Sequence, residues 1–135
     1  MEGEALRRLL AFGLAALAVV WGALLVVGAF TAPAYRHHEP NRRSYTTTLV
    51  QENGNWIVVP TAVPALVALV VGLMLYRRYR LGSANAGLVA WLGIGVLFAF
   101  AVVTLTTIGL YVLPIAVFLS GSALLIRRLG ARSAL

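Results

Sequence analysis

Residues 81–126 contain no charged side chain, and this stretch limits what the chain can fold into more than any other feature. It is 46 residues long, whereas a helix crosses the hydrocarbon core of a bilayer in about 20 mostly apolar residues. The stretch is therefore too long for one crossing and suits two crossings joined by a tight turn. Two further uncharged runs precede it, at residues 9–30 and 56–76. The sequence thus predicts four membrane-spanning helices.

Composition supports an integral membrane protein and argues against several classes of function. Hydrophobic residues form 61% of the 135 residues and charged residues form 11%, whereas soluble domains carry about 25% charged residues. The net charge is +7, and most arginines lie at the ends of the apolar runs. We therefore expect the arginines to contact lipid phosphates, and we expect no nucleic-acid partner. The absence of cysteine excludes disulfides, thiolate metal sites and thiol redox chemistry.

We predict an all-α integral membrane fold, in which a single domain of residues 1–135 forms a four-transmembrane-helix bundle. The expected helices cover residues 9–30, 56–76, 86–106 and 110–127, with an outer loop at residues 31–55. The first apolar run is longer than the roughly 7–15 residues of a signal peptide core. We therefore expect it to be retained as a spanning helix.

Glycine and proline suggest where the helices turn or bend. Between the third and fourth helices, Gly109 permits a positive φ, and Pro114 suits the first turn of the helix that follows. Pro64 lies within the second helix, where it removes one backbone hydrogen bond, so we expect a kink there.

The arginines predict the orientation of the helices, because cytoplasmic loops carry an excess of Arg and Lys. Arg7 and Arg8 precede the first helix, and six more arginines follow the second and fourth helices. With four crossings these eight residues lie on one side, against three arginines in the outer loop. We expect a multi-pass protein of the plasma (cytoplasmic) membrane with both termini in the cytoplasm. The six arginines are Arg77, Arg78, Arg80, Arg127, Arg128 and Arg132.

The outer loop contains the segment YRHHEPNRRS, residues 35–44, with both histidines of the chain. A metal site is not expected, because neighbouring histidine side chains diverge and the arginines repel a cation. Guanidinium and imidazole groups instead suit an anion or an acidic partner surface. A solvated loop that satisfies its own charges through Glu39 and Glu52 is the alternative. The predicted partner- or anion-binding residues are Arg36, His37, His38, Arg42, Arg43 and Trp56.

The same loop predicts a short β-hairpin on the outer face. Residues 44–51 are rich in Thr, Tyr, Val and Leu, and residues 56–59 are again β-branched and aromatic. The Asn-Gly-Asn sequence at residues 53–55 between them is a turn signal. Tyr45 and Trp56 are expected at the depth of the lipid headgroups.

Small residues recur in the apolar runs at spacings of three and four. Helices in lipid associate through close backbone approach, which small side chains permit. A tight bundle needs only these stripes, although one stripe facing outward would provide an interface for another protein. The residues expected to pack the helices are Ala11, Ala15, Ala18, Gly22, Ala68, Gly72 and Gly93.

Several chemistries lack the residues they need. Transporters, proton relays and ion channels usually place an ionisable side chain in the membrane, and none lies within the three uncharged runs. Small multidrug transporters depend on a Glu in the first helix, which residues 9–30 do not contain. No acid pair, glycine-rich phosphate loop or nucleophile beside a base is present, so we expect neither an enzyme nor a bound cofactor.

The stretch TLVQENG at residues 48–54 resembles a segment before the second helix of small bacterial four-helix membrane proteins. This resemblance covers the first two helices and their loop, and it implies no activity. The topology also resembles that of claudins superficially, but the claudin loop is longer and carries a cysteine pair that this chain lacks. The usage of arginine without lysine is typical of a GC-rich, bacterial source.

The expected function is non-catalytic. We expect an accessory or assembly subunit of a larger membrane complex, which docks through its outer loop and the small-residue faces of its helices. The alternative is a self-assembling membrane protein that binds lipid or a small apolar solute within its bundle. That alternative predicts a hydroxyl-lined cavity at Thr104, Thr107 and Ser120. The expected partners are the lipid bilayer and either a membrane protein or further copies of the chain.

Overall fold

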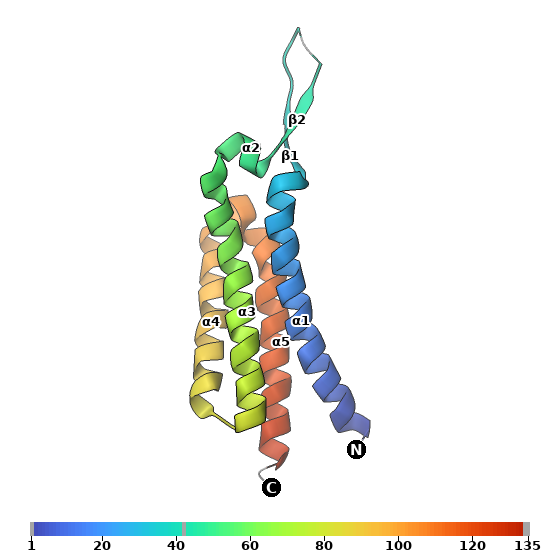
Figure 1. Ribbon diagram of the computed structural model, residues 1–135, viewed down its shortest axis with the longest axis vertical. Helices are drawn as coiled ribbons and strands as arrows, with labels where there is room; N and C mark the ends of the chain where they lie inside the picture. The colour runs from blue at the N-terminus through green and yellow to red at the C-terminus, as the bar shows by residue number, and fades with distance from the viewer. Residues whose placement is uncertain (1, 42, 134–135) are drawn as a thin grey trace.

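The computed structural model describes residues 2–41 and 43–133, apart from the side chains of residues 107 and 131–133. Four long helices run side by side, and a two-stranded sheet projects beyond one end of them (Figure 1). All four are long and apolar enough to cross a membrane, which confirms the predicted number of such helices. In chain order the elements are α1 (Glu2–Thr31), β1 (Pro33–His37), β2 (Tyr45–Thr48), α2 (Leu49–Asn53), η1 (Asn55–Ile57), α3 (Val58–Leu81), α4 (Ala84–Val103), η2 (Leu105–Gly109) and α5 (Leu110–Ser133).

The helices extend past the apolar runs into charged sequence. Helix α1 begins at Glu2, and its acidic first turn stabilises the positive end of the helix dipole. Helix α3 continues through Pro64 and ends at Leu81, and the next residue, Gly82, caps it with a φ of 63° in the left-handed region. The Gly82 amide donates to the Arg78 carbonyl, and Ser83 then caps α4 by accepting a hydrogen bond from the Ala86 amide. One short turn therefore joins α3 to α4.

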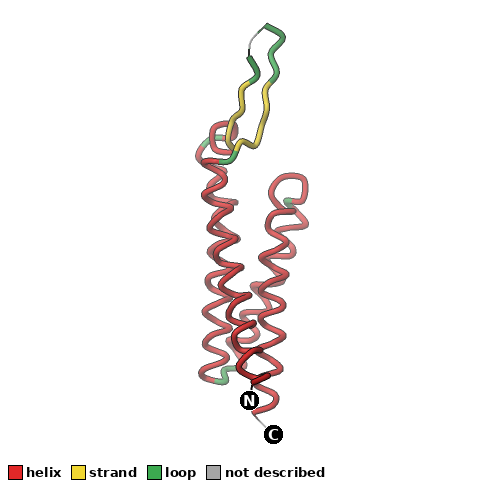
Figure 2. Tube along the Cα trace, turned by 90° about the vertical axis from the view of Figure 1, so that its right-hand side faces the viewer, coloured by secondary structure: helices red, strands yellow, loops and turns green. Residues whose placement is uncertain are grey.

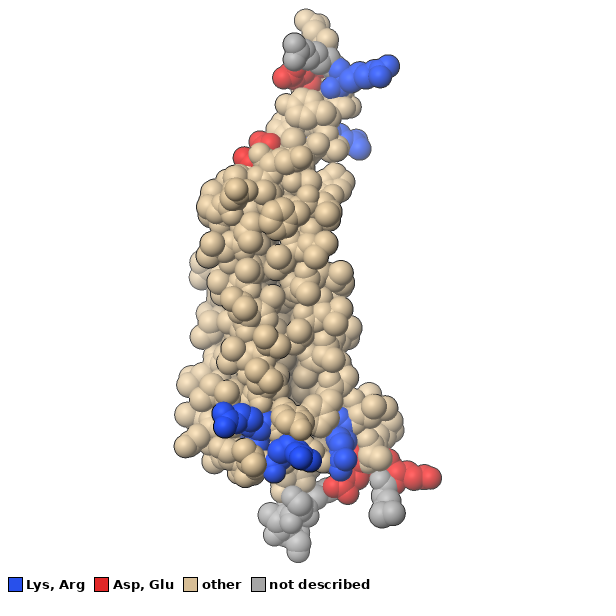
Figure 3. Space-filling model, in the orientation of Figure 1, with Lys and Arg blue, Asp and Glu red and all other residues tan. Residues whose placement is uncertain are grey.

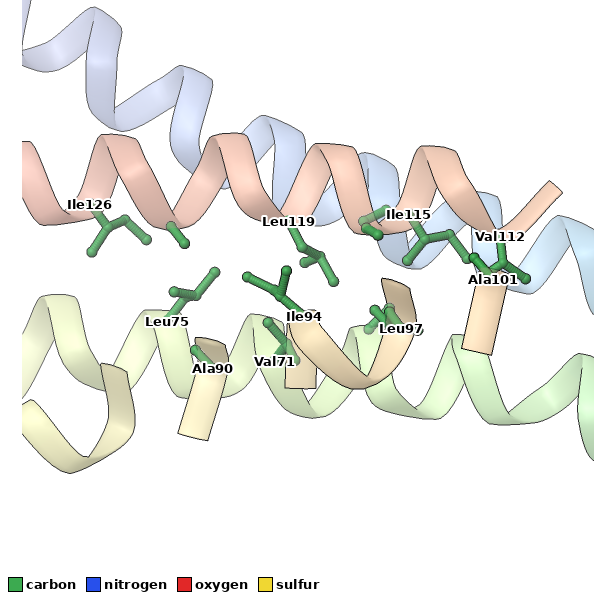
Figure 4. Close-up of a cluster of buried hydrophobic side chains, with 14 of the residues drawn as sticks. Val71, Leu75, Ala90, Ile94, Leu97, Ala101, Val112, Ile115, Leu119 and Ile126 are labelled. Atoms are coloured by element: carbon green, nitrogen blue, oxygen red, sulfur yellow. The ribbon is translucent and has the colours of Figure 1, made fainter. Parts of the chain in front are cut away.

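The core lies mainly between α3, α4 and α5. Helix α1 packs on α3 and α5, and α4 packs on the same two helices (Figure 1). Larger aliphatic side chains from α3, α4 and α5 point toward one another in Figure 4, whereas α1 contributes alanines and a glycine. The labelled core residues are Val71, Leu75, Ala90, Ile94, Leu97, Ala101, Val112, Ile115, Leu119 and Ile126.

Small residues bring α1 close to its two neighbours. Ala11, Ala15, Ala18 and Gly22 are all buried. A Cβ on Gly22 would lie 2.9 Å from the Cα of Ala65, so only glycine permits this approach to α3.

On the other helices the predicted packing residues divide. Ala68 is fully buried, and a Cβ on Gly93 would overlap the Val71 side chain of α3. Gly72 differs, because a Cβ there would meet nothing within 4 Å. It therefore lies beside the packed face of α3 rather than on it.

The connection between α4 and α5 is longer than predicted, because α4 ends at Val103 rather than at residue 106, and it uses its glycine differently. The turn is the π-helical segment η2, and Gly109 has a negative φ. A Cβ on Gly109 would overlap the Ala101 carbonyl oxygen, so this glycine permits close backbone approach rather than a positive φ. Pro114 is the fifth residue of α5 and lies just beyond its first turn.

The outer hairpin exists, but the predicted strand pairing is wrong. Strand β1 pairs with β2 in antiparallel register, with His37 opposite Tyr45. The segment expected as the second strand, residues 56–59, is helical and belongs to η1 and the start of α3. The segment expected as the first strand ends at Thr48, because Thr48 and Gln51 form a capping box that starts α2. Gly54, with a φ of 80°, separates α2 from η1 rather than joining two strands.

Among the described residues, charged side chains lie at the two ends of the molecule. On the face drawn in Figure 3, arginines gather at the end opposite the hairpin, and no charged side chain interrupts the long middle section. The start of α1 and the end of α5 lie at the arginine-rich end (Figure 2). The distribution of charge thus agrees with the uncharged runs of the sequence.

Candidate functional site: the outer hairpin

Three polar side chains fasten the hairpin to α2, and we call His37, Thr47 and Glu52 the hairpin latch. His37 Nε2 lies 2.9 Å from Glu52 Oε2, and Thr47 Oγ1 donates to the same carboxylate oxygen at 3.1 Å. A carboxylate only accepts hydrogen bonds, so Nε2 of His37 carries the proton. The latch joins β1, β2 and α2 into one unit.

Local sequence explains how these groups meet. The capping box of Thr48 and Gln51 begins α2 directly after β2, so the chain turns back and brings Glu52 near β1. Tyr45 lies opposite His37 in the strand register, and the two rings stack with centroids 5.0 Å apart and an interplanar angle of 22°. The His37 side chain therefore has a stacking partner as well as hydrogen-bond partners.

The remaining basic residues of the hairpin face outward. Arg36, His38 and Arg43 are exposed, and within residues 2–41 and 43–133 none of them forms a hydrogen bond or ion pair. In the view of Figure 3, the basic side chains of the hairpin lie toward one side and the acidic side chains toward the other. Arg42, which the sequence also predicted for this site, lies outside the described residues. Trp56 lies apart, in η1, with 63% of its surface exposed.

The solvated-loop alternative accounts for only part of this loop. Glu52 is engaged by His37 and Thr47, but it does not pair with an arginine. The exposed Glu39 carboxylate also forms no ion pair with a described arginine. Arginines that lack a carboxylate partner can form charge-assisted, bidentate hydrogen bonds with an external carboxylate or phosphate.

The described part of the chain contains no group of three or more His, Cys, Asp or Glu residues placed to hold a metal ion. His37 Nε2 forms a hydrogen bond with Glu52, whereas His38 follows the last residue of β1. The two neighbouring histidines thus have different surroundings.

An apolar crevice of about 490 Å³ opens at the outer ends of α1, α3 and α5. Gly28 and Ala29 of α1 line one side, Pro64 of α3 and Val112 of α5 line others, and Tyr35 of β1 lies at its outer edge. The Thr61 hydroxyl also lines the crevice, but it donates to carbonyls of its own helix turn. The crevice therefore offers mostly apolar surface to a ligand.

The two described hydroxyls among those expected to line a cavity donate to backbone carbonyls. Thr104 Oγ1 donates to the Phe100 carbonyl at 2.7 Å, and Ser120 Oγ donates to the Ala116 carbonyl at 2.7 Å. The Thr107 side chain lies outside the described side chains. Neither Thr104 nor Ser120 is among the residues that line the outer crevice.

Sequence reasoning missed the latch partner Thr47 and the residues of the outer crevice. A Thr-x-x-Gln capping pattern at Thr48 was a signal for α2, and hence for the position of Glu52.

No family model, curated protein or solved structure matches the chain. Function is therefore inferred from the hairpin and the bundle themselves.

Proposed function

We propose that the chain is a non-catalytic, multi-pass membrane protein that acts as an accessory or assembly subunit of a larger membrane complex. Its four apolar helices would form a transmembrane bundle, with the hairpin outside the plasma (cytoplasmic) membrane and both termini in the cytoplasm. Two features support this placement (Figure 3): the middle of the bundle lacks charge, and arginines gather at the end opposite the hairpin.

The observation that carries the proposal is the state of the hairpin charges. Glu52 is engaged by the latch, whereas Arg36 and Arg43 project from the hairpin without a carboxylate partner in the described chain. Charge complementarity makes an acidic surface on the extramembrane part of a partner protein the fitting occupant. The latch supports a docking role because it orders the hairpin before a partner binds, which lowers the entropic cost of association.

The hairpin suits docking better than the small-residue helix faces do. Ala11, Ala18 and Gly22 are buried against neighbouring helices of the same chain, so they are already occupied. Gly72 of α3 has no neighbour within 4 Å of a Cβ position, but a single small residue is not enough to form an interface with a partner. We therefore assign docking to Arg36 and Arg43, with the exposed ring of Trp56 beside the membrane surface.

The test is purification of the tagged chain from its native membrane in mild detergent, with the mass and protein content of the particle measured. We expect a second protein at fixed ratio. The double substitution Arg36→Glu and Arg43→Glu should remove that protein, because it places like charges against an acidic surface. Arg77→Glu with Arg128→Glu makes the same change of charge at the other end of the bundle and should leave the complex intact.

Two results would contradict the proposal. One is a particle that contains only this chain. The other is a partner that stays bound to the Arg36→Glu, Arg43→Glu variant.

A second function is favoured by the outer crevice: a self-assembling membrane protein that holds a lipid chain or a small apolar solute there. This function predicts a particle composed of 14.4-kDa chains and an apolar molecule that co-purifies with it. Gly28→Leu would fill the crevice without a clash, because a Cβ on Gly28 meets nothing within 4 Å. Gly13→Leu adds the same side chain to α1 away from the crevice and is the control. Retention of the molecule by Gly28→Leu would contradict this function.

A further inference from the structure

A basin of about 860 Å³ lies at the end of the bundle opposite the hairpin. It is open between the start of α1, the end of α3 and the end of α5, where α1 leans away from its neighbours (Figure 1). Ile126 and Leu129 of α5 form its apolar part, and Ile126 also belongs to the hydrophobic core. The basin therefore begins where the packed interior ends.

The rim of the basin is strongly basic. Arg78 and Arg80 of α3 and Arg127 of α5 line it, together with the carboxylate of Glu4. Within the described residues no carboxylate lies within 4.0 Å of these three guanidinium groups. Three positive groups and one negative group thus surround a space that is large enough for a polar headgroup.

Packing fixes part of this rim in place. The Arg78 side chain lies across α4 at Gly87, where a Cβ would overlap its guanidinium group. The Tyr79 ring, which also lines the basin, packs edge-on against Phe12 with centroids 5.4 Å apart. The Arg8 guanidinium carbon lies 5.3 Å from the centroid of the same ring. The Tyr79 contacts order the side of the basin between α1 and α3, and the contact at Gly87 holds Arg78 against α4.

We propose that this basin binds the phosphate headgroup of an anionic phospholipid from the membrane leaflet at the arginine-rich end. The proposal rests on the membrane placement given above, but not on the accessory role. Guanidinium groups bind phosphate through charge-assisted, bidentate hydrogen bonds, and basic pockets between helices suit anionic headgroups. The apolar floor at Ile126 and Leu129 lies beside the uncharged span of α5, so an acyl chain can follow that helix into the bilayer.

Compensation of helix dipoles explains these arginines only in part. The negative ends of α3 and α5 both lie at this end of the bundle, and Arg78 and Arg80 in the last turn of α3 stabilise the end of that helix. Compensation of the dipoles requires neither a basin between the arginines nor the contact of Arg78 with Gly87. Glu4 supplies a further distinction, because its carboxylate should weaken the binding of an anion and strengthen the binding of a headgroup amine.

The experiment measures lipid binding to the purified chain in detergent by native mass spectrometry. The probes are phosphatidylglycerol and phosphatidylcholine with identical acyl chains. Arg78→Gln and Arg127→Gln should each weaken phosphatidylglycerol binding about tenfold, the loss expected for one charge-assisted contact. Arg77→Gln and Arg128→Gln remove the same charge at the same end but outside the basin, and they should change binding less than about twofold.

Two further variants test the geometry without loss of an arginine. Gly87→Ala should weaken phosphatidylglycerol binding, because the new Cβ displaces the Arg78 guanidinium while every charge remains. Glu4→Gln should strengthen binding. Thermal unfolding of each variant without lipid separates these effects from misfolding.

Three outcomes would overturn the proposal. Equal losses in the basin and control variants would indicate diffuse attraction to charge. Inorganic phosphate that displaces phosphatidylglycerol at equal concentration would indicate a site for a free anion. A chain that fails to float with phosphatidylglycerol vesicles would overturn the membrane placement as well, whereas an absent protein partner would affect only the accessory role.

Discussion

The helical bundle and the outer hairpin are stabilised by different kinds of contact. The bundle is packed through small and aliphatic side chains, and its buried Ser122 hydroxyl donates to the Ala11 carbonyl of α1 at 2.7 Å. The hairpin is fastened by the latch, whose His37 and Glu52 side chains are about one-third exposed, at 33% and 38%. Water competes for the hairpin contacts but is excluded from the bundle contacts. Substitutions in the bundle should therefore unfold the whole molecule, and those in the hairpin should act locally.

The largest effect is expected at the contact between α1 and α3. Gly22→Leu would force the two backbones apart, because even a Cβ lies 2.9 Å from the Cα of Ala65. We expect a loss of about 3 kcal/mol in the free energy of unfolding. The measurement is reversible unfolding in mixed detergent micelles. Gly13→Leu, on the same helix with nothing within 4 Å of a Cβ, is the control. Equal stability of the two variants would mean that α1 does not pack on α3 through Gly22.

A smaller effect is expected at the hydrogen bond between α5 and α1. Ser122→Ala removes the donor to the Ala11 carbonyl from a fully buried position, and we expect a loss of about 1 kcal/mol. Ser120→Ala is a matched control on the same helix, since its hydroxyl donates to the Ala116 carbonyl one turn back. The same unfolding assay compares the two variants. A larger loss for Ser120→Ala would contradict the assignment of Ser122 as the contact between the helices.

Helix periodicity explains why the sequence predicted the packing of α1 better than that of α3. The stripe of Ala11, Ala15, Ala18 and Gly22 alternates spacings of four and three, which follows the 3.6-residue turn, and all four are buried. On α3 the prediction went from Ala68 to Gly72, a step of four residues that turns slightly past the same face of the helix. The buried face instead continues from Ala68 to Val71 and Leu75, so Gly72 falls beside it.

The hairpin shows where local sequence is insufficient. The apolar runs are long enough to identify the four long helices by themselves. Strand pairing depends on which distant segment approaches, and residues 33–37 carry no obvious strand pattern next to the charged turn. The latch was not predicted either, because Glu52 meets His37 only after the Thr48 capping box has turned the chain. The basic character of the loop was readable from the sequence.

A local effect is expected from breaking the latch. Glu52→Ala removes the acceptor of both His37 and Thr47, and such exposed contacts contribute about 0.5–1 kcal/mol. Backbone amides of β1 and β2 should therefore exchange hydrogen roughly two to five times faster, while the unfolding of the bundle stays unchanged. Hydrogen exchange with mass spectrometry measures this, and Glu39→Ala is the control because Glu39 forms no ion pair with a described residue. A fall in bundle stability would contradict the separation of the two regions.

The smallest effect on stability is expected at the hairpin surface. Arg43 is exposed and contacts no carboxylate among the described residues, so Arg43→Gln should change neither hydrogen exchange in the strands nor the unfolding of the bundle by more than about 0.5 kcal/mol. Both assays above measure this directly. A clear loss of stability would mean that Arg43 supports the hairpin itself. An unchanged fold matters for the docking proposal. If the hairpin stays ordered, loss of a partner on substitution of Arg43 results from the missing guanidinium group and not from disorder of the hairpin.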